Sequence, residues 1–137
     1  MLVQTFRPNE AAVALACKLD VEGFYKAELA QRQALFFPPY SRLIRFVARS
    51  KDPRRADSAL KRLAASLEKE LASGTELLGP AECPLSVIAG NERRQIIIRG
   101  ESMGSLHRAA RLALGAYEKE KEREVYIEID VDPVSLL

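Results

Sequence analysis

Basic side chains are grouped at two places in this sequence where the chain is expected to turn. Lys51, Arg54 and Arg55 stand in the segment SKDPRR, and Arg93 and Arg94 stand in the segment NERRQ. Loops and helix starts expose cationic side chains, so that they can meet phosphate groups. We therefore predict that these five residues contact a phosphate backbone. A solvated charge cluster without a ligand is the alternative for each segment.

Groups that could carry out catalysis are not found in a recognisable arrangement. His107 is the single histidine and has no cysteine or second histidine at ligand spacing, so a structural role is the simpler interpretation. Asp130 and Asp132 would project to one side of a strand and could hold Mg²⁺, but pairing with arginines is the stronger interpretation. Neither GxGxxG nor GxxxxGKS/T occurs, so any ATP chemistry is expected elsewhere.

Length and composition predict one globular unit with at most a small appendage. The chain has 137 residues, of which 47% are apolar. No apolar stretch approaches the roughly 20 residues that cross a bilayer, and the first residues lack the layout of a secretory signal, so a cytoplasmic protein is expected. Cys17 and Cys83 stand far apart without a CxxC pattern, which predicts two reduced, partly buried thiols.

The net charge of +2 conceals an uneven distribution of charge along the chain. Residues 1–50 hold seven Lys/Arg and four Asp/Glu, and residues 51–111 hold eleven and eight. The last 26 residues hold three Lys/Arg and seven Asp/Glu. A basic body with an acidic end can present a positive face that the net charge does not reveal.

The N-terminal part predicts a short strand followed by two helices. The opening LVQTF is typical of a strand, but no hairpin partner follows it. One helix is predicted from Asn9, which would cap it, and a second from Asp20. Both helices should end before Pro38, because the residue before a proline is pushed out of the α region. The predicted buried positions of the second helix are Phe24, Leu29 and Leu35, with Val21 and Tyr25 beside them.

After the double proline the hydrophobic period changes from helical to alternating. SRLIRFVARS and RRQIIIR are predicted strands, while TELLGPAECPLSVIAG should form short extended pieces. Asp52-Pro53 starts a helix with apolar residues at Leu60, Leu63, Leu67 and Leu71. A second helix is capped by Ser102 or Ser105, runs to residue 122, and places Leu106, Ala110, Ala113 and Tyr117 on one face. In the final strand, EVYIEIDVDP, the predicted inward residues are Val125, Ile127, Ile129 and Val131.

This order of elements predicts an α+β fold of the ferredoxin-like, split βαβ type, with both helices on one face of the sheet and a helical connector before it. In such a sheet the first strand lies beside the last. Arg45 and Arg49 would then face Glu128 and Asp130 across the strand pair. If these charges pair, the open face is poorly suited to hold a phosphate backbone.

Five segments together resemble the C-terminal region of PriA, the primosomal protein N′ helicase family of bacteria. They are VQTFRP, FYKAELAQRQALFFPPYSRL, LLGPAECPL, GNERRQIII and IDVDPVSLL, and they occur in the family's order. The resemblance implies that residues 1–39 are the last strand of a helicase lobe with a helical connector. It implies that residues 40–137 are a ferredoxin-like C-terminal domain.

The resemblance also implies partners for the chain. These are forked or single-stranded DNA, the helicase lobes of the same longer chain, and the acidic tail of single-stranded DNA-binding protein, with no membrane. ATP, Mg and zinc are expected only in the rest of the parent helicase, and no cofactor is expected here. Glu92 and Arg94 replace aromatic residues of many relatives, so base stacking at those positions is not expected. Met103 and His107 stand where some relatives bind the tail, which makes His107 a partner-tail candidate.

Two other functions remain open at this point. The domain could be mainly a structural brace on the helicase lobes that docks protein partners. It could also be a free-standing, ligand-binding regulatory domain of ferredoxin-like fold, although the unpaired LVQTF and the family resemblance argue against this. The expectation from the sequence is a non-catalytic, fork-binding C-terminal domain.

Overall fold

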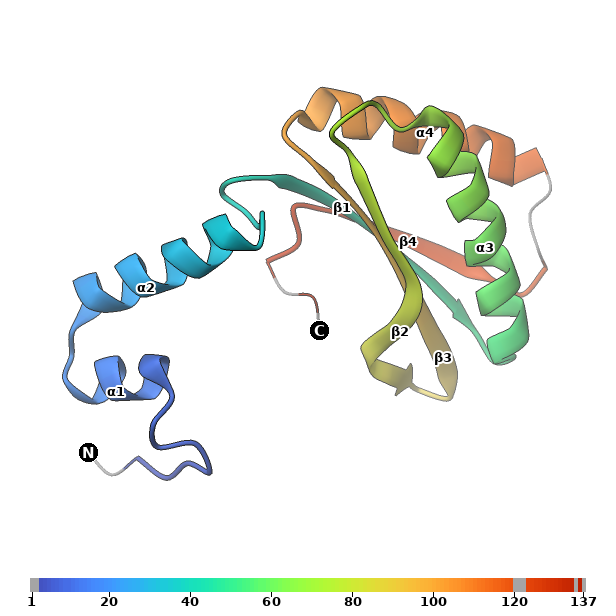
Figure 1. The fold of residues 1–137 in the computed structure, drawn as a ribbon. Helices are drawn as coiled ribbons and strands as arrows, with labels where there is room; N and C mark the ends of the chain where they lie inside the picture. The colour runs from blue at the N-terminus through green and yellow to red at the C-terminus, as the bar shows by residue number, and fades with distance from the viewer. Residues whose placement is uncertain (1–2, 120–122, 135, 137) are drawn as a thin grey trace. The chain divides into compact units, whose positions relative to one another are not determined.

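The computed structural model in Figure 1 describes residues 3–119, 123–134 and 136. The chain divides into two compact units, residues 1–40 and residues 41–137. Among the described residues, every buried side chain belongs to the second unit. Both predicted basic segments, SKDPRR and NERRQ, belong to this second unit, which has the hydrophobic core.

The first unit contains two helices, α1 (Ala11–Cys17) and α2 (Val21–Ala34). Asp20 caps α2 as predicted, because its Oδ1 accepts a hydrogen bond from the Gly23 amide at 2.9 Å. The predicted cap of α1 is wrong: Glu10 holds the N-cap position and makes no side-chain bond there. Residues 3–6 form no strand here, and the predicted strand, whose sheet is expected outside this sequence, stays a prediction. An isolated segment has no neighbouring strand to satisfy its amides and carbonyls.

The second helix buries none of its side chains within the first unit. Tyr25 and Leu35 are each 61% exposed, and Leu29 is also exposed. The prediction that Leu29 and Leu35 are buried is therefore wrong, and Phe24 is only partly buried. Two helices of this length enclose too little volume for a core of their own.

The second unit has an antiparallel four-stranded sheet in the order β2-β3-β1-β4. Its elements are β1 (Arg42–Ser50), α3 (Pro53–Glu70), β2 (Glu76–Ile88), β3 (Asn91–Gly100), α4 (Met103–Lys119) and β4 (Tyr126–Val131). Both helices lie on the same side of the sheet (Figure 1). The predicted α+β class is confirmed, and the strand and helix order agrees with the split βαβ expectation.

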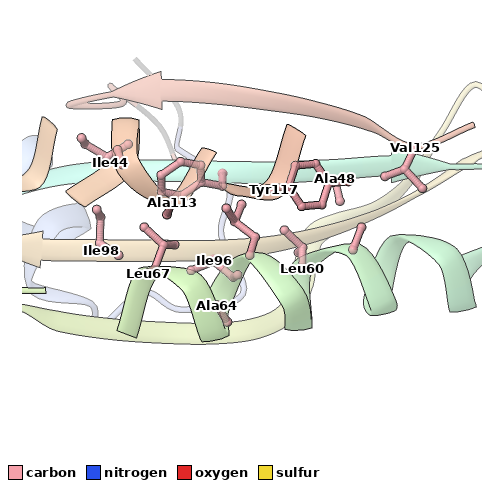
Figure 2. Packing of buried hydrophobic residues seen from close by; sticks show 14 of the residues in the cluster. Ile44, Ala48, Leu60, Ala64, Leu67, Ile96, Ile98, Ala113, Tyr117 and Val125 are labelled. Atoms are coloured by element: carbon pink, nitrogen blue, oxygen red, sulfur yellow. The ribbon is translucent and has the colours of Figure 1, made fainter. Parts of the chain in front are cut away.

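The core lies between the helices and one sheet face, as Figure 2 shows for Ile44, Leu60 and Ile96. The helix residues predicted to face the sheet are buried, namely Leu60, Leu63, Leu67, Leu106, Ala110, Ala113 and Tyr117. Leu71 packs against this core from the end of α3. Each fully buried Leu or Ile contributes about 1.5–3 kcal/mol relative to exposure, so apolar packing dominates the stability of the unit.

Two predicted features of the sheet edges need correction. β2 is one strand rather than several pieces. Its register against β3 shifts between Leu78 and Ala81 and again between Glu82 and Val87, so bulges take up the irregular positions without ending the strand. At the other edge, Ile129 and Val131 lie on the core-facing side of the sheet as predicted, but they are 47% and 44% exposed rather than buried. They pair with Phe46 and Ile44 of β1, but α4 packs over β1 and β3 instead.

Both helices of the second unit begin at predicted caps. Asp52 accepts a hydrogen bond from the Arg54 amide at 2.9 Å, and Pro53 occupies the first turn of α3. Ser102 rather than Ser105 serves α4, because its Oγ accepts from the Ser105 amide at 3.3 Å. The last residues of the predicted helix, 120–122, lie outside the described residues.

Candidate nucleic-acid interface

The two basic segments of the sequence meet at one end of the sheet. In the register of β1 with β3, Arg49 lies opposite Arg93 and Ser50 lies opposite Glu92. The turn from β1 into α3 is therefore next to the hairpin that joins β2 and β3. We call this the hairpin end, and it also includes the start of β4, where Tyr126 lies opposite Arg49.

The turn between β1 and α3 presents two cations that form no ion pair with any described residue. Lys51 and Arg54 are both exposed, and the Asp52 cap fixes the backbone between them. Arg55, by contrast, donates through Nη1 to Glu124 at 2.6 Å, and its Nε lies 3.8 Å from Asp52. Lys51 and Arg54 are thus the more available side chains of this segment.

The two hairpin arginines differ in their surroundings. Arg93 is only 8% exposed, and its Nη1 donates to the Leu85 carbonyl at 3.1 Å. Arg94 forms an ion pair with Glu82 at 2.6 Å, and its side chain is 18% exposed. Its position between the hairpin and the helix start leaves Arg94 closer to solvent than Arg93.

Arg54 and Arg94 line one hollow although they are 40 residues apart in the sequence. The hollow has a volume of about 440 Å³, is open to solvent, and includes Pro53 and Pro80. Asp57 and Glu82 also line it and reduce its positive potential. Phosphate binding here would require the arginines to exchange carboxylate partners for phosphate oxygens, which guanidinium groups bind with the same fork geometry.

The sheet face opposite the helices has charges that are already partnered. Arg49 forms an ion pair with Glu128, as the strand order predicts. Arg45 lies opposite Asp130 in the register, but its Nε donates to Gln95 at 2.8 Å, and only 4% of the residue is exposed. This pairing favours the hairpin end over the open face as a place for phosphates.

Asp132 joins the end of β4 to the start of β1 and is not a free metal ligand. Its Oδ2 accepts from Arg42 Nε at 2.7 Å, and its Oδ1 accepts from the Leu43 amide at 3.0 Å. The hydrogen bond from Arg42 is the largest influence that lowers the pKa of this carboxyl. The charge of His107 lowers it further, which places the exposed His107 of α4 near this end of β4.

The described residues provide neither a metal cluster nor a membrane span. No group of three or more His, Cys, Asp or Glu side chains that could hold a metal ion occurs among them. No helix in the described ranges is long and apolar enough to cross a membrane. Both cysteines are free as predicted, but Cys17 is exposed rather than partly buried, because α1 has no covering layer, and Cys83 is buried.

The chain is thus an α+β domain whose hairpin end has accessible basic side chains with acidic side chains among them. Residues 33–134 match the family model described as primosomal protein N C-terminal domain. The chain belongs to this family, the C-terminal region of PriA. The family resemblance of the sequence is confirmed.

Curated relatives extend the similarity beyond the family model. Replication restart protein PriA of Treponema pallidum is 43% identical over 137 residues, which is all of this chain and 20% of the relative. The protein of the same name from Borreliella burgdorferi is 35% identical over 138 residues, again all of this chain and 20% of the relative. The protein of that name from Thermotoga maritima is 35% identical over 102 residues, which is 74% of this chain and 13% of the relative. The chain therefore spans a fifth or less of these relatives.

One similar structure concerns the fold alone. The de novo designed protein Foldit4 superposes with a TM-score of 0.51 at 13% identity, over 69% of this chain and 99% of the designed one. A protein designed without this family's function can share the arrangement, so the function must be argued from side chains.

Proposed function

We propose that the chain is the non-catalytic C-terminal domain of a replication-restart DNA helicase, and that it binds forked or single-stranded DNA through phosphate contacts. The observation that supports this most is the meeting of both basic segments at the hairpin end, through the pairing of Ser50 with Glu92. Family membership and relatives named replication restart protein support the cellular role.

Within this proposal the five basic residues have different tasks. Lys51 and Arg54 contact phosphates directly, because they are exposed and form no ion pair with a described residue. Arg55 and Arg94 exchange Glu124 and Glu82 for phosphate oxygens. Arg93 holds the hairpin backbone in place, since its guanidinium is bonded to Leu85 beneath the surface.

The remaining length of the parent protein would supply the chemistry. We assign ATP hydrolysis with its Mg, and separately a zinc site, to the rest of that protein, because the family resemblance places the helicase lobes before this domain. This chain would pack against those lobes and position the fork for them. Its binding to DNA alone should be weak and salt-sensitive, because about four phosphate contacts provide most of it.

Paired charge reversal tests this proposal. Lys51→Glu with Arg54→Glu should reduce affinity for forked DNA at low salt. It should also reduce the slope of log K against log salt by about 1.4 to 1.8, because each phosphate that is no longer neutralised accounts for about 0.7 on a single strand and about 0.9 on a duplex. Fluorescence anisotropy with a labelled fork, repeated at several salt concentrations, measures both quantities.

The matched control is Arg108→Glu with Arg111→Glu. This double variant changes the net charge by the same amount. Its two residues lie in α4, which begins near the end of the sheet opposite the hairpin end, where Gly100 pairs with Arg42. Equal losses of affinity for both double variants would mean that only net charge matters. Binding of the unsubstituted chain that does not depend on salt would contradict phosphate contacts altogether.

A second candidate function is a structural brace that docks protein partners. The exposed apolar side chains of β4 and the position of His107 near Asp132 favour it. Titration with an acidic peptide that corresponds to the tail of single-stranded DNA-binding protein separates the two. Peptide binding that His107→Ala abolishes, in a chain that does not bind DNA, would support the brace.

A further inference from the structure

Tyr126 is an exposed aromatic residue at the hairpin end to which the proposed function gives no task. It is the first residue of the edge strand β4, and 60% of it is exposed. Its side chain shares the open sheet face with Arg49, its partner in the strand register. A large exposed ring at a strand start is a suitable surface for a flat apolar ligand.

The ring is held in position by its neighbours. The guanidinium carbon of Arg49 lies over the ring, 5.5 Å from its centroid. Arg49 in turn forms an ion pair with Glu128, the next residue of β4 on the same face. A ring fixed by a charged pair loses little side-chain freedom when a ligand stacks on it.

A hollow of about 420 Å³ lies beside the ring and is lined by Arg49, Asn91, Glu124, Val125 and Tyr126. This volume falls in the range of small-ligand sites. Asn91 lines the hollow with a side-chain amide whose Nδ2 donates to the Ala89 carbonyl at 3.2 Å. Its Oδ1 is a hydrogen-bond acceptor suited to the amino or imino group of a base.

The surrounding charges favour a nucleotide over other flat ligands. Lys51 follows Arg49 by two residues, and Arg55 is bonded to Glu124, which lines the hollow. A ring with a guanidinium beside it, a side-chain amide and nearby cations together match a base with its flanking phosphates.

We propose that Tyr126, with Arg49 and Asn91, forms a stacking site for one unpaired nucleobase of a single strand whose phosphates lie on the basic segments. This inference rests on the proposed DNA binding and deepens it, because it adds a base contact to phosphate contacts. It makes the domain prefer unpaired over fully paired DNA, since a base inside a duplex cannot reach the ring.

A tryptophan reporter gives a direct test, because the sequence contains no tryptophan. In the full 137-residue chain, Tyr126→Trp should show fluorescence quenching on addition of an oligothymidylate of about eight nucleotides. An abasic oligonucleotide with the same number of phosphates should bind without this quenching. The control Tyr25→Trp changes a tyrosine of almost equal exposure, 61%, in α2 and should show no quenching with either.

Affinity provides a second measurement that does not depend on the reporter. Tyr126→Leu should weaken oligothymidylate binding by about 5- to 150-fold, the usual effect of removing one stacked base. Tyr126→Phe should keep the affinity of the unsubstituted chain. Neither change should alter the salt slope, because all phosphate-binding side chains are retained.

The outcomes distinguish this inference from the function on which it rests. If oligothymidylate binds with a salt-dependent affinity but leaves the Tyr126→Trp fluorescence unchanged, the stacking site is overturned and phosphate binding stands. The same holds if Tyr126→Leu and Tyr126→Phe bind equally well. If neither oligonucleotide binds at low salt, both the stacking site and the proposed DNA binding are overturned.

Discussion

Arg93 and Arg94 are neighbours in the chain, yet their guanidinium groups have different environments. Arg93 donates a hydrogen bond to the Leu85 carbonyl of β2, while Arg94 lines the hollow beside Arg54. Their identical side chains made them equivalent candidates in the sequence. Burial beneath the irregular β2 hairpin separates the two, and it leaves Arg94 as the hairpin residue suited to a phosphate.

Asp132 offers a test at a single carboxyl. Its lowered pKa means that the folded state favours the ionised form, so its stabilisation is present above the ordinary Asp pKa and is lost as pH falls through the folded value. We predict that Asp132→Asn costs about 1 kcal/mol in the free energy of unfolding at pH 7. Urea unfolding should show this difference shrinking as the pH falls below about 4.

Asn is the suitable replacement at this position, because the backbone of residue 132 has a φ of +48°, which Asn tolerates well. Asp130→Asn changes an exposed carboxylate two residues earlier, in β4, and serves as the control; it should leave stability within about 0.5 kcal/mol. A cost of Asp132→Asn that is equal at pH 7 and pH 3 would contradict an electrostatic origin.

The irregular strand β2 depends on Gly79. This residue has a φ of +103°, and a Cβ built on it would lie 2.8 Å from the Gln95 carbonyl oxygen of β3. Neither the backbone angle nor the space accepts a side chain, so Gly79→Ala should destabilise the second unit by about 1–3 kcal/mol. Thermal unfolding followed by circular dichroism measures the effect.

The matched control is Gly115→Ala in helix α4, where a Cβ would meet nothing within 4 Å. Alanine is favoured over glycine inside a helix, so this variant should gain about 0.5–1 kcal/mol. If both alanine variants unfolded at the same temperature, the close approach of β2 to β3 at Gly79 would have no energetic consequence.

The two units should be thermodynamically independent in this chain. The core cluster consists only of residues from Ile44 onward, and the described residues of the first unit contain none that is buried. We predict that a chain of residues 41–137 has the same free energy of unfolding in urea as the second unit of the full chain, within about 0.5 kcal/mol. The control Leu60→Ala, in the core, should cost about 2–5 kcal/mol in either chain.

A large loss of stability on removing residues 1–40 would show that the helices of the first unit contribute to the core of the second. In the parent protein the exposed side chains of α2 would have another surface to cover them, if the proposed helicase lobes precede this chain. Their exposure here therefore does not predict poor folding of residues 41–137, whose core is complete without them.

Local signals in the sequence were sufficient for the α+β class, the caps of α2 and α3, and the buried faces of α3 and α4. Alternation and helical period depend on neighbouring residues only, so they can be recognised without a structure. The same signals failed for the buried positions of α2 and for Ile129, because burial depends on whether another layer covers the face that the pattern provides.

The basic residues of the candidate site were identifiable by type, and the chain's family by its segments in order. What only the tertiary structure decided is how these residues are grouped: Arg54 with Arg94, Arg93 beneath the hairpin, and Tyr126 beside Arg49. The register of antiparallel strands joins positions that are far apart in sequence, and no local pattern specifies that register to a single residue.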